Sequence, residues 1–168
     1  GDDMAGGGII TELVHDEQEG LREEARQREY AWLTGDVRAE DRATQYGHRA
    51  AIVLFTGSAQ TGKTFLARRV EALLVADSRH AYLLEGENLL QGLDADLSAA
   101  DPSFAAERVR RYGEVARLLI DTGLIVVSTS KTFGINYQRM AEMIRTLVQP
   151  APVIAVHMSR AGEEPPPN

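Results

Sequence analysis

The chain has 168 residues, 43% of them hydrophobic and 26% charged, and its net charge is −7 at pH 7. This length predicts one domain, or one domain with an arm. The lack of cysteine excludes disulfides, iron–sulfur clusters and thiolate zinc sites, and the acidic balance argues against a nucleic-acid binder. No apolar run approaches the roughly 18 residues of a membrane helix, and no apolar leader is visible. We therefore expect a cytoplasmic protein with no membrane or nucleic-acid partner.

The excess acid lies in the N-terminal part of the sequence. The first 49 residues carry 6 Arg and 12 Asp or Glu, whereas the remainder carries 12 Lys or Arg and 13 acids. Residues 1–8, rich in glycine, are typical of an expression scar or a flexible lead. Thin apolar spacing among many Glu, Arg and Gln over residues 9–48 predicts an acidic helical arm or a linker. We expect the folded domain at residues 49–160 and a proline-rich tail at 161–168.

From residue 50 onward, short apolar runs alternate with apolar stripes at helical spacing. The runs predict buried strands at residues 50–55, 81–84, 124–127 and 153–156. The stripes predict helices around residues 66–74, 112–120 and 137–148. The run at 124–127 is the richest in β-branched residues, so we expect it at the centre of the sheet. The alternation predicts a three-layer α/β fold, with a mainly parallel sheet and helices on both faces.

A glycine-rich segment lies between the first predicted strand and the first predicted helix. It fits the phosphate-loop pattern G-x-x-x-x-G-K-[ST] without mismatch, which a chain of this composition would contain by chance about 0.002 times. Its glycines let consecutive N–H groups converge on a phosphate, and the following helix points its positive end there. The candidate nucleotide-binding residues are Gly57, Ser58, Ala59, Gln60, Thr61, Gly62, Lys63 and Thr64. We expect Lys63 to neutralise phosphate charge and the Thr64 hydroxyl to bind Mg²⁺.

Carboxylates follow the second predicted strand at Glu85 and Glu87. The carboxyl edge of a parallel sheet, beside a phosphate loop, is where such sheets bind ligands. A small-molecule kinase needs an acid there, either to order water on Mg²⁺ or to accept the proton of the acceptor hydroxyl. Glu85 is therefore the candidate catalytic residue beside Lys63 and a candidate Mg²⁺ ligand through water. The alternative is an acid in a solvated turn.

Several sequence blocks, taken in order, resemble the adenylylsulfate kinase family of P-loop kinases. The similarity covers roughly residues 32–158. The blocks are V-R-A-E-D-R with G-H-R, the phosphate loop, L-L-E-G-E-N, Q-G-L, R-R-Y-G-E-V-A-R-L and D-T-G-L-I-V-V. The resemblance implies a P-loop NTPase fold, ATP as co-substrate with Mg²⁺, and a homodimer. It also implies a role in sulfate assimilation, with phosphate transferred from ATP to the 3′-hydroxyl of adenylylsulfate.

The candidate substrate side departs from the family pattern. Glu85 and Glu87 stand where the family has Asp, and Leu90 and Ala105 stand where it has arginines. A phosphosulfate is bound mainly through charge-assisted donors worth roughly 1.5–3 kcal/mol each, so two lost arginines could weaken binding by about two to four decades. The candidate substrate-binding residues that remain are Glu87, Asn88, Arg108, Arg111 and Lys131.

Three functions stay open from the sequence. The first is an ATP-dependent adenylylsulfate kinase. The second is a degenerate nucleotide-binding domain without kinase activity, attached to a larger protein that carries an upstream domain. The third is a small-molecule kinase for another acceptor. After Met158 the family continues into a helix and a mobile lid, so we expect the lid to come from another chain or domain, or transfer to be poor.

Overall fold

The protein is described from a computed structural model. The structure describes residues 20, 23, 27, 32, 33, 35–129, 137–160 and 162. The candidate substrate-binding residue Lys131 lies outside the described residues, as do most of the predicted arm and most of the predicted tail.

Four parallel strands form the sheet. They are β1 (Ala51–Gly57), β2 (Ala81–Leu83), β3 (Ile125–Thr129) and β4 (Val153–Met158). Their order is β2-β3-β1-β4, and each neighbouring pair is parallel. The four predicted strands are therefore confirmed, and β3 lies inside the sheet as expected. Because the strands are parallel, their carboxyl ends meet at one edge.

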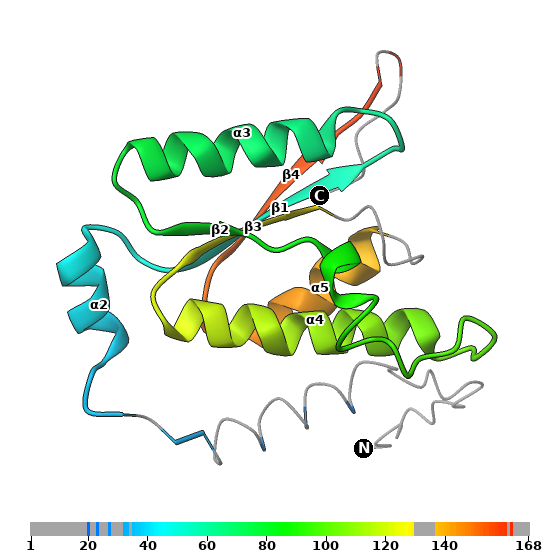
Figure 1. The fold of residues 1–168 in the computed structure, drawn as a ribbon, viewed down its shortest axis with the longest axis horizontal. Helices are drawn as coiled ribbons and strands as arrows, with labels where there is room; N and C mark the ends of the chain where they lie inside the picture. The colour runs from blue at the N-terminus through cyan, green and yellow to red at the C-terminus, as the bar shows by residue number, and fades with distance from the viewer. Residues whose placement is uncertain are drawn as a thin grey trace, which may run out of the picture.

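Helices cover both faces of this sheet, which confirms the predicted three-layer α/β fold. The described helices are α2 (Ala39–Tyr46), α3 (Lys63–Ala76), the short 3₁₀ helix η1 (Gly86–Leu89), α4 (Phe104–Asp121) and α5 (Tyr137–Val148). Figure 1 shows α3 on one face, with α4 and α5 on the other. α4 begins eight residues before the predicted stripe. No described helix combines the length and the apolar composition that crossing a bilayer requires.

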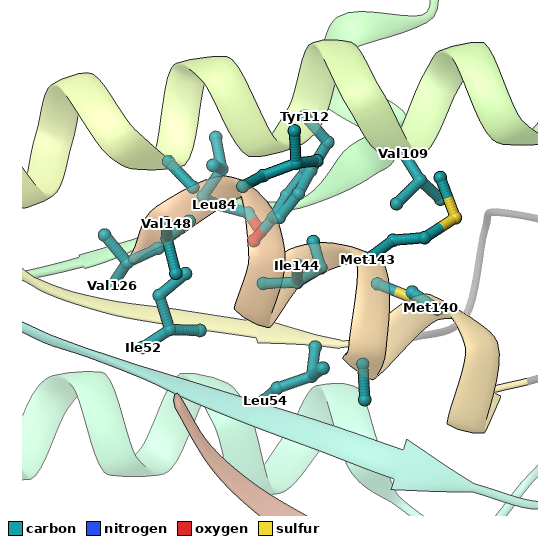
Figure 2. Close-up of a cluster of buried hydrophobic side chains, with 13 residues drawn as sticks. Ile52, Leu54, Leu84, Val109, Tyr112, Val126, Met140, Met143, Ile144 and Val148 are labelled. Carbon is teal, nitrogen blue, oxygen red and sulfur yellow. The ribbon is translucent and has the colours of Figure 1, made fainter. Parts of the chain in front are cut away.

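The hydrophobic core has one part on each side of the sheet. Ile52 and Leu54 of β1 point toward α4 and α5, where they pack in a cluster with Tyr112 and Ile144 (Figure 2). Phe55 faces the opposite way and packs with Ala67 of α3. This alternation follows from the two-residue period of a strand that is covered on both faces. The packed layers hold the strand ends, and the loops that follow them, in fixed relative positions.

Candidate active site

The ends of all four strands contribute side chains or backbone to one edge of the sheet. The phosphate loop follows β1, Glu85 lies two residues after β2, Thr129 ends β3 and Arg160 lies two residues after β4. The register pairs Phe55 with Thr129 and Gly57 with Met158, so these groups lie at similar heights along the sheet. The predicted loop and the predicted acid Glu85 therefore share the carboxyl edge, where parallel sheets bind ligands.

The phosphate loop leaves β1 by a turn that requires glycine. Gly57 has φ +116°, and a Cβ added there would lie 2.0 Å from the carbonyl oxygen of Met158. Gly62 has φ +86° and caps the amino terminus of α3, which starts at Lys63. The first backbone N–H groups of α3 have no partner inside the helix, and the helix dipole makes this end positive. The predicted strand–loop–helix geometry is therefore present.

Lys63 lies inside the loop, with 6% of its surface exposed. Its ammonium donates to the carbonyl oxygens of Gly57, at 3.0 Å, and of Ser58. It also lies 3.4 Å from the Thr61 hydroxyl, which itself donates to the Ser58 carbonyl at 2.9 Å. These contacts keep a buried cation at the centre of the loop. A polyphosphate would offer that ammonium stronger, charged acceptors than the carbonyls it contacts here.

Glu85 is held beside β3 in a largely buried position. The Thr129 hydroxyl donates to Glu85 Oε2 at 2.9 Å, and 8% of Glu85 is exposed. Tyr112 of α4 lies fully buried close by, with its hydroxyl 3.5 Å from the carbonyl oxygen of Leu84. Burial raises the pKa of the Tyr112 phenol, and the negative charge of Glu85 raises it further. Glu85 is therefore held in a largely buried position and is not an acid in a solvated turn.

Arg108 forms a buried ion pair instead of extending into solvent. Its Nε lies 3.3 Å from Asp94 Oδ2, and the two side chains are 5% and 1% exposed. Its Nη2 donates to the Gly86 carbonyl at 3.4 Å, and its guanidinium lies 5.4 Å from the centre of the Phe104 ring. Arg108 thus joins α4 to η1 and to the turn at Asp94. Its predicted contact with substrate stays a prediction.

Arg111 is also engaged in ion pairs. Its guanidinium binds both carboxylate oxygens of Asp96, and its Nε donates to Glu107 at 2.8 Å. Arg110 donates to both oxygens of the same Glu107, at 2.7 and 2.8 Å. Hydrogen bonds from Arg110, and then from Arg111, lower the pKa of Glu107 to about 2. This network ties α4 to the segment around Asp96, and a role for Arg111 in substrate binding stays a prediction.

The remaining candidates follow the carboxyl ends of β1 and β2. Glu87, half-buried, and Asn88, exposed, belong to η1 directly after Glu85. Thr64, half-buried, is the second residue of α3. Within the described ranges, no three His, Cys, Asp or Glu residues gather as a group that could hold a metal ion. The Mg²⁺ ligands that the sequence predicts are the Thr64 hydroxyl and, through water, the Glu85 carboxylate.

Sequence reasoning missed several residues that contact the candidates, and three of them contact Glu85, Arg108 and the phosphate loop. They are Thr129, which holds Glu85, Asp94, which pairs with Arg108, and Arg160, which donates to the Ala59 carbonyl at 2.9 Å. The position of Thr129, two residues after the predicted central strand at 124–127, was a usable signal. No local pattern marks the other two.

A separate cavity of about 430 Å³ lies at the other end of the strands. Ala50 and Pro152, which precede β1 and β4, line it together with Trp32 and Arg117. The Arg117 guanidinium stacks 4.8 Å from the Trp32 ring and donates to the Gln149 carbonyl at 3.1 Å. No residue of the phosphate loop lines this cavity. This cavity is therefore distinct from the candidate active site at the phosphate loop.

A phosphate loop between the first strand and the first helix of a parallel sheet, with a buried lysine inside it, defines an α/β protein of the P-loop class. Residues 49–164 match the model of one family of that class, described as adenylylsulphate kinase. The chain belongs to the adenylylsulphate kinase family.

Individual proteins agree with this assignment. The adenylyl-sulfate kinase of Shewanella amazonensis is 38% identical over 128 residues, which cover 76% of this chain and 63% of that protein. A mutant of the Mycobacterium tuberculosis APS kinase CysC superposes with a TM-score of 0.58 at 31% identity, covering 70% of this chain and 80% of that one. The same kinase in complex with AMPPNP and APS gives a TM-score of 0.55 at 32% identity, covering 65% of this chain and 62% of that one. The chain spans 57–63% of the length of its first curated relatives.

Proposed function

We propose that this chain transfers the γ-phosphoryl group of ATP to the 3′-hydroxyl of adenylylsulfate, giving ADP and 3′-phosphoadenylylsulfate. Family membership over residues 49–164 supports the reaction, as does similarity to a kinase whose structure contains AMPPNP and APS. The observation that carries the proposal is the buried Lys63 inside an intact phosphate loop. Such a lysine binds the terminal phosphates of the donor nucleotide.

The residues of the site have distinct roles in this reaction. Backbone N–H groups of the loop and the start of α3 bind the polyphosphate, and Lys63 neutralises charge on the transferred group. As the acceptor oxygen bonds to the γ-phosphorus, the bond from that phosphorus to the β,γ-bridging oxygen breaks, and ADP leaves with the electron pair. Glu85, held by Thr129, accepts the proton of the 3′-hydroxyl.

Mg²⁺ would be held by the Thr64 hydroxyl and, through water, by Glu85. Both donors are oxygen atoms, the type that Mg²⁺ prefers, and the ion keeps several waters and phosphate oxygens in such sites. When bound, it neutralises phosphate charge. The homodimer, the domain limits at residues 49 and 160, and the cytoplasmic location remain part of this proposal.

A second candidate is a nucleotide-binding domain that does not transfer phosphate. The ion pairs of Arg108 with Asp94 and of Arg111 with Asp96 favour it, because these two arginines are, with Lys131, the candidate cations for the phosphosulfate. If those pairs persist when nucleotide binds, neither arginine is available to replace the family arginines absent at Leu90 and Ala105.

Release of ADP in the presence of ATP, Mg²⁺ and adenylylsulfate tests the proposal. We expect turnover that depends on adenylylsulfate and falls by at least about 100-fold in Lys63→Ala, because Lys63 stabilises the transferred phosphoryl group. Arg145→Ala, at an exposed position on α5, is the matched control and should keep wild-type turnover. Turnover equal in wild type and Lys63→Ala would refute kinase activity. Tight ADP binding without turnover would favour the second candidate.

A further inference from the structure

Arg160 reaches the phosphate loop from the far end of the chain. β4 pairs with β1 so that Met158 lies opposite Gly57, and the residues after each strand therefore run close together. Arg160 Nη2 donates to the Ala59 carbonyl at 2.9 Å and lies 3.4 Å from Gln60 Oε1. The guanidinium thus contacts the backbone of one loop residue and the side chain of the next.

The residue that Arg160 contacts has an unfavourable backbone conformation. Within the loop, Gly57, Gln60 and Gly62 have positive φ angles, and Gln60 is the one with a side chain, at φ +61°. Left-handed backbone is unfavourable for a residue with a Cβ, because the Cβ approaches the carbonyl oxygen. Glycine is the usual residue at such a position. Contacts elsewhere must therefore help to keep Gln60 in this conformation.

Two cations hold three consecutive carbonyls of the loop. Lys63 binds the carbonyls of Gly57 and Ser58 from α3, and Arg160 binds the carbonyl of Ala59 from the end of β4. Because a trans peptide is planar, its N–H points opposite to its C=O. A donor on the Ala59 carbonyl therefore also fixes the direction of the Gln60 N–H. The orientation of such N–H groups decides whether a loop can bind phosphate.

We propose that Arg160 is a positioning residue for nucleotide binding, which holds the Ala59–Gln60 peptide and the Gln60 side chain in the conformation that receives the polyphosphate. This inference rests on the proposed binding of nucleotide by the loop, and it does not require phosphoryl transfer. Arg160 acts through the loop backbone, so its importance depends on the residue at position 60. A glycine at that position adopts the conformation without help.

Calorimetric titration of the full chain with ADP tests this role. We expect Arg160→Ala to weaken ADP binding by about three- to tenfold, because an exposed charge-assisted contact is modest in water. Arg160→Lys should recover part of the loss, since an ammonium can donate to one of the two acceptors. The exposed control Arg145→Ala should bind as the wild type does. In a Gln60→Gly background, Arg160→Ala should cost less than about twofold.

Thermal unfolding of the same variants separates positioning from a merely structural role. We expect the effect of Arg160→Ala on ADP affinity to depend on the residue at position 60. The melting temperatures of all variants should be similar. ADP affinity of Arg160→Ala equal to that of Arg145→Ala would overturn the inference, and so would an equal loss with Gln60 or Gly at position 60. Should Arg160→Ala not fold, Arg160→Lys in the two backgrounds gives the same comparison. Wild type that binds ADP no better than Lys63→Ala would overturn the proposed function as well.

Discussion

Removing the carboxylate of Asp94 should strongly destabilise the fold. Asp94 and Arg108 form an ion pair at 3.3 Å, with side chains 1% and 5% exposed. Asp94→Ala would leave the guanidinium buried without this carboxylate, and breaking one partner of a buried pair costs about 3–5 kcal/mol. Small domains have unfolding free energies of about 5–15 kcal/mol. The variant should therefore lose a large share of its stability.

Removing both charged side chains together should lower the free energy of unfolding far less. In the double variant Asp94→Leu/Arg108→Met, apolar side chains of similar size replace the pair, and such replacements are often neutral or stabilising by about 1–4 kcal/mol. Asp94→Leu has the same side chain at position 94 as the double variant, so the difference between these two reports the buried charge of Arg108 and not packing at position 94. A double-mutant cycle completed with the single variants Asp94→Leu and Arg108→Met gives the interaction energy.

Urea unfolding followed by circular dichroism gives the free energies, and titration with adenylylsulfate gives binding for the same proteins. We expect Asp94→Ala to shift the unfolding midpoint far below that of the double variant. A cost below about 1 kcal/mol for Asp94→Ala, together with a clear change in adenylylsulfate affinity, would refute the reasoning. Arg108 would then act as a ligand-binding residue and not as part of a structural pair.

Three further predictions concern pH, helix packing and the loop. Glu107→Gln should be less stable than wild type above pH 4.5, and this difference should vanish as the pH falls to about 2. The reason is that the lowered pKa of Glu107 stabilises the fold only while the carboxylate is charged; urea midpoints that differ equally at all pH values would contradict it. Gly113→Ala should cost about 1–3 kcal/mol, because its Cβ would lie 2.5 Å from Leu147 Cδ1. Adding Leu147→Ala should make Gly113→Ala less costly in urea unfolding, and an unchanged cost would count against the packing argument. Gly57→Ala should abolish ADP binding in calorimetry, because its Cβ would clash with the Met158 backbone; retained affinity would show that the turn can adjust.

The elements that the sequence could predict are those whose signal is local. Continuous apolar runs marked β1 and β3 because both faces of these strands are covered. The phosphate loop could be predicted for the same reason: its glycines, lysine and threonine lie within eight consecutive residues. The stripe at 112–120 marked only the later turns of α4; its earlier turns also carry Glu107, Arg110 and Arg111, whose ion pairs stabilise them.

The contacts that set the chemistry of the site could not be predicted, because they join distant parts of the chain. Thr129 and Glu85 are 44 positions apart, and Arg160 and Ala59 are 101 positions apart. Such contacts depend on which strands are neighbours, whereas apolar periodicity shows only which face of a strand is buried. Arg108 lies in a family block that did not predict its ion pair, and its contact with substrate stays a prediction. In the fold, the rotation of α4 directs it toward Asp94.

The central claim is that the backbone around positions 57–64 binds the polyphosphate of a nucleotide. Amide resonances followed by ¹H–¹⁵N NMR during titration with ADP test this most directly. The account predicts large shifts for the amides of Gly62, Lys63 and Thr64, and their loss in Lys63→Ala. Shifts confined to the opposite end of the sheet, around Trp32 and Arg117, would contradict it, and so would unchanged spectra at saturating ADP.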